Sequence, residues 1–238
     1  MERLRSYPKL QLAVHVGAVL PVLWLAIRYW QNALGVDPIQ ILERRTGDTA
    51  LIFLLLSLAC TPLTTLTGSR KLIKLSRPLG IYAFLYGTLH FLTFTGIDYQ
   101  FNFPLLQPEF LQKKYIFLGI TGLLILSLLA VTSFKSWMKR LGKNWKRLHR
   151  LVYLAGVLLV IHYTWAKKGD LFHLQGEVLL PFLAAMTLAF LLVMRLPGVR
   201  RSVSAARLRL TSRLSAFRVE RKEKSLAKRE NQALENDL

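Results

Sequence analysis

The sequence predicts an all-α membrane protein, a bundle of six transmembrane helices with both termini in the cytoplasm. Hydrophobic residues make up 53% of the 238 residues although the net charge is +20, which fits apolar residues in lipid and basic residues in loops and tails. Six stretches approach the roughly 20 mainly apolar residues that a spanning helix needs. Lys and Arg gather in alternate connections between these stretches.

The six predicted spans follow one another at approximately residues 10–30, 48–67, 78–97, 115–134, 149–166 and 176–195. No small-residue cleavage site is evident near the first span, which predicts a retained helix rather than a signal peptide. Pro21, Pro62 and Pro181 lie in spans or near their ends, where proline is tolerated if a neighbour satisfies the freed carbonyl group. No internal repeat is evident. The predicted organisation is a cytoplasmic N-terminus at 1–9, a six-helix domain at 10–195 and a basic cytoplasmic tail at 196–238.

Basic residues in the connections predict the orientation of the helices, because cytoplasmic loops are enriched in Lys and Arg. The segment before the first span holds Arg3, Arg5 and Lys9, and the connections after the second and fourth spans are more basic. The three alternate connections carry fewer basic residues and also contain acids. Both termini are therefore predicted to be cytoplasmic.

Histidines are the polar residues of interest within the predicted spans. His15 lies in the first span, His90 in the third and His162 in the fifth, with His149 at the cytoplasmic mouth of the fifth. Charged groups in a bilayer are costly and usually mark function, and these spans contain almost none. A neutral imidazole is a good ligand for iron, copper or zinc. His173 is expected to be an ordinary loop residue.

His90 and His162 are predicted to lie at one depth in the membrane. His90 lies thirteen residues beyond Arg77, and His162 thirteen beyond His149. At a rise of about 1.5 Å per residue, both lie ~20 Å from the cytoplasmic side. Two histidines at one depth on facing helices suit a six-coordinate b-type heme. No carboxylate is expected nearby to form a proton relay, and the alternative is that each histidine only hydrogen-bonds a neighbour.

His149 and His15 are predicted to lie nearer the cytoplasm, where they could hold a second heme or border a flavin. On an ideal helix, His149 points about 140° away from His162. Arg77 occupies the place on the third helix where a partner of His149 would fall. Arginine cannot ligate iron, but it can pair with a heme propionate or a flavin phosphate. The alternative for His149 is an interfacial histidine near lipid headgroups.

Three segments carry a resemblance to a known family. They are "LGVDPIQILERRTGDTALIFLLLSLACTPL" at 34–63, "RPLGIYAFLYGTLHFLTF" at 77–94 and "LGKNWKRLHRLVYLAGVLLVIHYTW" at 141–165. Together they resemble the MsrQ (YedZ) family, the heme-binding membrane subunits of periplasmic methionine sulfoxide reductase systems. This family is similar in turn to the wider group with a ferric-reductase-like transmembrane domain. The resemblance covers roughly residues 10–195.

The resemblance implies a role in electron transfer across the bacterial inner membrane. In that family a cytoplasmic flavin reductase or the quinone pool supplies electrons, and FMN and b-type heme carry them. A periplasmic molybdopterin subunit accepts them and reduces methionine sulfoxide in damaged envelope proteins. The family's heme histidines correspond to His90, His149 and His162, and His15 falls where the family often has a histidine. One heme or two are implied.

The chain is expected to need a separate electron donor. Only 43 residues follow Arg195, and they hold no glycine-rich dinucleotide motif. No nucleophile or carboxylate–histidine arrangement for substrate chemistry is evident, so an electron-transfer subunit is expected rather than a complete enzyme. Two alternatives remain: a ferric or cupric reductase of the same fold, and a small histidine-dependent transporter. The lack of intramembrane Asp and Glu disfavours the transporter.

The tail has a helical pattern of its own. Apolar residues recur at helical spacing with arginines between them, at Val199, Val203, Ala206, Leu210, Leu214 and Phe217. This pattern predicts an amphipathic helix on an anionic membrane surface. A docking surface for an acidic soluble reductase is the alternative. Beyond residue 220, mixed charges indicate a solvated, partly disordered end.

Overall fold

The computed structural model describes residues 6–167, 178–213, 217 and 224, and these residues form helices without a strand. The long helices are α1 (Ser6–Trp30), α2 (Pro38–Thr67), α4 (Ser76–Leu92), α6 (Lys114–Val131), α9 (Leu151–Ala166) and α10 (Leu179–Val193). The short helices α3 (Arg70–Ile73), α5 (Phe103–Gln112), α7 (Lys135–Leu141) and α8 (Lys143–Leu148) connect them. Each predicted span overlaps one long helix. His173 and the tail beyond residue 213, apart from residues 217 and 224, lie outside the described residues.

Four helical segments in the described part of the chain are long and apolar enough to cross a membrane: Lys9–Trp30, Pro38–Thr67, Lys114–Val131 and Lys143–Ala166. A fifth results if α10 and the helix Pro197–Arg213, which meet at a bend of 79°, count as one broken span. α4 falls short because it has 17 residues before a π-helix begins at Thr93. The chain is therefore a multi-pass membrane protein, whereas the count of six spans and the cytoplasmic termini stay predictions.

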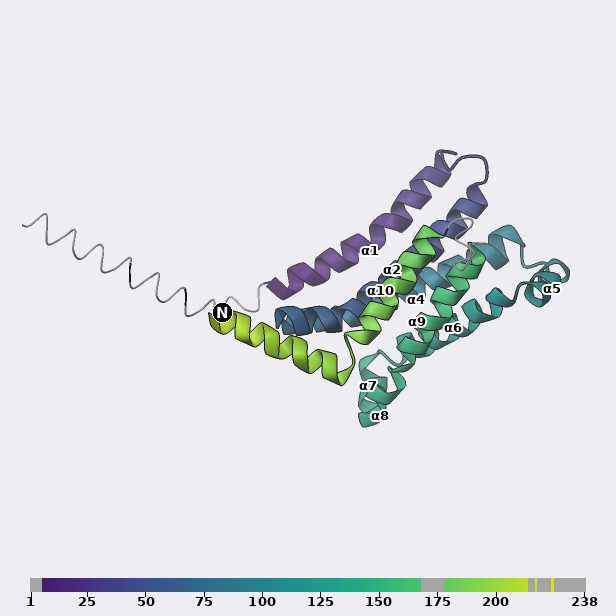
Figure 1. The fold of residues 1–238 in the computed structure, drawn as a ribbon. Helices are drawn as coiled ribbons and strands as arrows, with labels where there is room; N and C mark the ends of the chain where they lie inside the picture. Colours follow the sequence, from purple (N-terminus) through teal and green to yellow (C-terminus); the bar gives the residue numbers. More distant parts are fainter. Residues whose placement is uncertain (1–5, 168–177, 214–216, 218–223, 225–238) are drawn as a thin grey trace, which may run out of the picture.

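Two helix pairs form the centre of the bundle. α2 packs along α4, and α6 packs along α9 (Figure 1). Contacts between α4 and α6 join the two pairs, and α10 packs on α9 and α2. α1 makes few contacts with α2 and α4 and stands apart along one edge (Figure 1).

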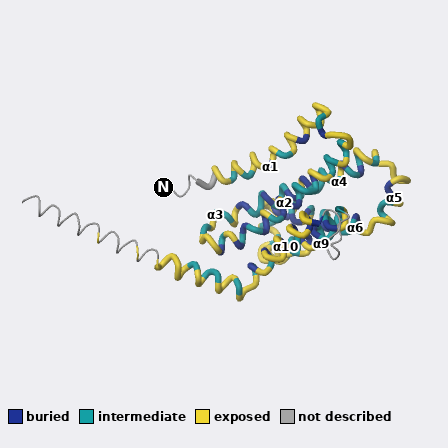
Figure 2. Tube along the Cα trace, turned by 45° about the horizontal axis from the view of Figure 1, so that its top comes forward, coloured by how far each residue is buried: buried dark blue, intermediate teal, exposed yellow. Residues whose placement is uncertain are grey.

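Burial follows this arrangement. Leu54, Ala83 and Ala155 are almost fully buried between the central helices. Large apolar side chains such as Leu124 and Phe190 are exposed on the outer surfaces instead, and Figure 2 shows α1 exposed along most of its length. Apolar residues on the outside are expected for helices that face lipid, because lipid tails are as apolar as the side chains themselves.

Neighbouring side chains accommodate the prolines of α1 and α2. Pro62 lacks the N–H that would bind the carbonyl oxygen of Leu58 four residues earlier, and Arg195 Nη2 donates to that oxygen at 2.6 Å. Next to Pro21 in α1, Tyr86 Oη accepts from the backbone N–H of Val22 (3.1 Å) and donates to the carbonyl of Ala18 (2.6 Å). The carbonyl group that Pro62 frees thus has a partner in the absence of water, and so do two backbone groups beside Pro21, as helices in lipid require.

Candidate functional site: a paired-histidine cavity

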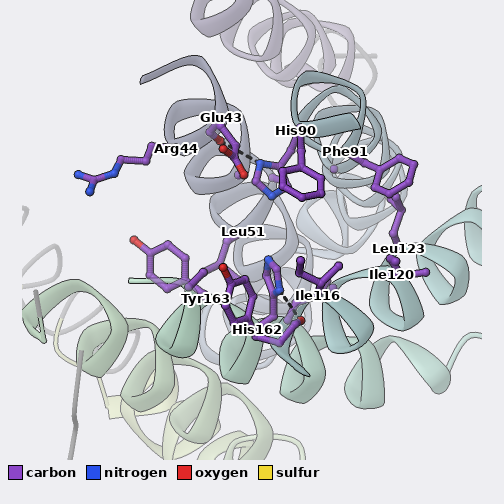
Figure 3. A pocket seen from close by; sticks show the side chains of 18 of the residues that line it. Glu43, Arg44, Leu51, His90, Phe91, Ile116, Ile120, Leu123, His162 and Tyr163 are labelled. Atoms are coloured by element: carbon purple, nitrogen blue, oxygen red, sulfur yellow. Dashed lines mark hydrogen bonds between the residues drawn. The ribbon is translucent and has the colours of Figure 1, made fainter. Parts of the chain in front are cut away.

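His90 of α4 and His162 of α9 face each other across a cavity of about 430 Å³ (Figure 3). Their ring centroids are 6.2 Å apart, and the ring planes cross at 75°. The cavity lies between the two central helix pairs, since residues of α2, α4, α6 and α9 line it. The structure therefore brings together the two histidines for which the sequence predicts a common depth.

A backbone carbonyl holds each ring. His90 Nδ1 lies 2.9 Å from the carbonyl oxygen of Glu43, and His162 Nδ1 lies 2.8 Å from that of Tyr115. A carbonyl oxygen only accepts, so Nδ1–H is the donor in both rings. Each Nε2 is then left without a proton, with its lone pair free to bind a metal. A hydrogen bond from the other ring nitrogen is the usual way in which proteins fix the orientation of a ligating histidine.

Two glycines make room for the rings. A Cβ atom added to Gly47 would lie 3.2 Å from His90 Nδ1, and one added to Gly119 would lie 2.8 Å from His162 Nδ1. Both glycines lie inside long helices, α2 and α6. Glycine is costly within a helix, and here it lets an imidazole ring lie directly against the neighbouring helix.

The two halves of the site repeat each other along the chain. Glu43, Gly47 and His90 recur at a shift of 72 residues as Tyr115, Gly119 and His162. In each half the glycine lies one helical turn after the residue whose carbonyl oxygen accepts from the histidine, and the histidine comes from the next long helix. The repeat was not evident in the sequence because it consists of a shared spacing, with few identical residues.

The spacing of the rings fits a metal held between two imidazoles. With metal–nitrogen bonds of about 2 Å, ligation by both Nε2 atoms places the ring centroids about 6 Å apart, which agrees with the observed 6.2 Å. Within the described residues, no group of three or more His, Cys, Asp or Glu side chains could hold a metal ion. Two histidines alone are too few for a structural zinc site, but they suffice for heme, whose macrocycle supplies the other ligands. The residues present therefore fit a heme with two histidine ligands.

Carboxylates also line this cavity, which corrects the expectation that none lies near the histidine pair. Glu43 and Asp48 of α2 contribute to its wall. Asp48 Oδ1 is buried and has no hydrogen-bond partner among the described residues. The expectation was wrong because α2 begins at Pro38, ten residues before the predicted start, so its first turns run beside α4.

Charged residues from the π-helix and from the ends of α6 and α9 also line the cavity. Asp98, Lys113 and Lys167 contribute to its lining. Burial raises the pKa of the Asp98 carboxyl group, with nearby carboxylates adding to the effect. The ion pair with Glu109 raises the pKa of Lys113, so that this side chain stays cationic. Charged side chains thus share the lining of the cavity with the histidine pair.

The other predicted site residues lie outside this cavity, since none of His15, Arg77 and His149 lines it. The His149 ring packs on Trp145 with centroids 3.9 Å apart, and its Nδ1 and Nε2 lie near Trp145 O (3.1 Å) and Ser133 Oγ (3.4 Å). His15 is exposed, with its Nδ1 2.7 Å from Tyr82 Oη. A cofactor role for these three residues stays a prediction.

Comparisons with known proteins agree with the fold. A family model described as ferric reductase like transmembrane component matches residues 46–160. The protein-methionine-sulfoxide reductase heme-binding subunit MsrQ of Rhodospirillum rubrum is 40% identical over 193 residues, which covers 80% of this chain and 89% of the relative. The chain belongs to the MsrQ family. The MsrQ of Xanthomonas oryzae pv. oryzae is 42% identical over 164 residues, covering 66% of this chain and 75% of the relative.

Proposed function

We propose that this chain is the heme-binding membrane subunit of a methionine sulfoxide reductase system, with one b-type heme held between His90 and His162. The observation that carries the proposal is the facing pair of rings, 6.2 Å apart, with both Nδ1 atoms committed to backbone carbonyls. The names of the MsrQ relatives, which describe heme-binding subunits, support it. When bound, the heme supplies a one-electron carrier.

The chain's own residues position and insulate this carrier. The carbonyl groups of Glu43 and Tyr115 set which nitrogen of each histidine faces the cavity. Leu51, Leu123 and Phe91 give the cavity apolar walls, which keep water away from the site. Low polarity and controlled solvent access are two of the means by which a protein sets the potential of its heme.

The proposed direction of transfer is outward across the bacterial inner membrane. A cytoplasmic flavin reductase or the quinone pool donates electrons, with FMN as a second carrier. A periplasmic molybdopterin-containing methionine sulfoxide reductase accepts them, and the pathway repairs oxidised envelope proteins. The predicted topology supports this direction, because it places the end of the bundle with Asp98 and Lys113 on the periplasmic side.

Substitution of the two histidines tests the heme site. Purified His90→Ala and His162→Ala proteins are expected to lose most of the Soret band and of the reduced α-band, because each lacks one of the two histidines that would hold the heme. His15→Ala serves as a matched control, since this exposed histidine lies outside the cavity. Retention of the full wild-type spectrum by either cavity variant would contradict the assignment.

A ferric or cupric reductase is the second candidate, and the match to a ferric-reductase-like family model favours it as the runner-up. The acceptor distinguishes the two functions. The reduced protein is expected to transfer electrons to a co-purified molybdopterin subunit faster than to chelated ferric iron. The reverse order would favour the metal reductase, and a colourless preparation without heme would favour a transporter.

A further inference from the structure

The chain makes a sharp elbow where α10 ends. α10 stops at Val193, and the helix Pro197–Arg213 leaves at 79° to it. Arg195 fixes this elbow to the bundle, because its Nη1 donates to Tyr153 Oη and its Nη2 to the carbonyl of Leu58, both at 2.6 Å. Its guanidinium group also lies over the Tyr153 ring, 5.0 Å from the centroid.

A second contact holds the helix that follows the elbow. Arg207 Nη1 donates to the carbonyl of Thr65 at 2.9 Å, in the last turn of α2. A Cβ atom added to Gly68 would lie only 2.9 Å from the same nitrogen, so the arginine packs closely against this glycine. The helix Pro197–Arg213 is therefore anchored at both Arg195 and Arg207, and in Figure 1 it runs beneath the end of α2.

A basic cavity of about 580 Å³ lies at the elbow. Arg195, Arg200 and Arg201 line it together with Ser204, and none of its lining residues is acidic. Arg195 Nε is buried and has no hydrogen-bond partner among the described residues. The N-terminus of the 197–213 helix adds the positive end of a helix dipole to this side of the cavity. Guanidinium groups gathered in this way favour a phosphate group over a carboxylate, because phosphate offers more acceptor oxygens.

The cavity also has an apolar side. Pro197, Ala205 and Leu208 complete its lining. Apolar side chains are also exposed near the end of α10, with Phe190 at 58% and Val193 at 50%, and at Leu196, 54% exposed, in the connection that follows. A free phosphate ion would gain nothing from these groups. An amphiphile would place its phosphate on the arginines and its acyl chains along α10.

We propose that the elbow between α10 and the 197–213 helix is a binding site for one anionic phospholipid, with the lipid phosphate held by Arg195, Arg200 and Arg201. The site lies at the end of an apolar helix, where headgroups of a bilayer are found. Lipid bound there holds the 197–213 helix against the membrane surface. This lipid site does not depend on heme binding. The composition of the tail alone predicts only a diffuse attraction to the membrane, whereas the elbow provides a defined pocket.

The test is lipid binding to the purified full-length chain, measured by native mass spectrometry. The first phosphatidylglycerol molecule is expected to bind at least tenfold more tightly than phosphatidylcholine. Replacing Arg200 and Arg201 together by Gln is expected to weaken this first event by about thirtyfold, the effect of two arginines at a membrane surface. The matched control replaces Arg209 and Arg213 by Gln, because these exposed residues lie on the same helix outside the cavity. This control variant is expected to keep the first site.

Three results would overturn the proposal: equal weakening in both double variants, no weakening in either, or displacement of the lipid by inorganic phosphate at the same concentration. The first would indicate diffuse attraction, and the last a site for free phosphate. Ser204→Trp provides a variant that fills the cavity without loss of charge. It is expected to block the first lipid while the far-UV circular dichroism spectrum stays unchanged, and full retention of that lipid would also contradict the site.

Discussion

The helix pairs α2–α4 and α6–α9 have the same arrangement of residues at one end of the bundle and different residues at the other. At the cavity end, each pair contributes a carbonyl group, a glycine and a histidine at the same spacing. Ala83 and Ala155, related by the same shift of 72 residues, are both 0% exposed. At the other end the corresponding residues are Arg77 and His149. The two helix pairs therefore present two facing imidazoles at the cavity end, whereas the corresponding positions at the opposite end hold an arginine and a histidine.

Under the proposed function, the heme site is the facing histidine pair at the cavity end, where the π-helix Thr93–Asp98 follows α4. At the opposite end the His149 ring packs on Trp145, and the corresponding residue of α4 is Arg77, whose guanidinium group cannot ligate iron. The proposal thus places the heme at one level of the repeat only. Variants at matched positions of the two helix pairs test how far the pairs are equivalent.

The largest effect is expected from filling the space beside His162. Gly119→Ala places a methyl group 2.8 Å from the ring, closer than the 3.2 Å of Gly47→Ala beside His90. Overpacking of this kind costs about 1–3 kcal/mol, so Gly119→Ala is expected to lower heme retention roughly tenfold and Gly47→Ala by less. Gly17→Ala is the control, because nothing lies within 4 Å of its added Cβ atom. Heme-to-protein ratios measure the series, and equal ratios in all three variants would show that the glycines are not needed for the rings.

A smaller effect, on stability, is expected from removing the donor that Arg195 provides beside Pro62. Arg195→Gln leaves the Leu58 carbonyl without its donor, which costs about 1–3 kcal/mol for a buried group. Thermal unfolding in detergent is expected to show a midpoint lowered by a few degrees. In a Pro62→Ala background the backbone N–H returns to that carbonyl, so the same substitution should cost less. An equal cost in both backgrounds would show that Arg195 acts elsewhere.

The smallest effect is expected at the opposite end of the repeat. His149→Ala and Arg77→Gln should leave the heme-to-protein ratio at its wild-type value, because neither residue lines the cavity. Pyridine hemochrome analysis measures this ratio. A ratio halved in the His149 variant would show a second heme at that level and would restore the equivalence of the two ends.

Sequence reasoning located the long helices and the two facing histidines, because apolar length and helical rise are properties of single segments. It missed Glu43 and Asp48 as cavity residues, since the start of α2 depends on the cap formed by Asp37 and on packing against α4. It also missed Gly47 and Gly119. Their role depends on a ring contributed by another helix, and only the 72-residue shift in spacing could have indicated it. The elbow cavity was equally out of reach, because a bend between two helices leaves no periodic signal.

Electron paramagnetic resonance of the oxidised, heme-loaded protein tests the central claim most directly. The wild-type protein is expected to give a low-spin ferric signal with the strong anisotropy of two imidazoles whose planes are crossed, as the 75° between His90 and His162 requires. Any heme left in His90→Ala or His162→Ala should turn high-spin. A high-spin wild-type signal, or a low-spin signal that persists in both variants, would contradict ligation of one iron by this pair.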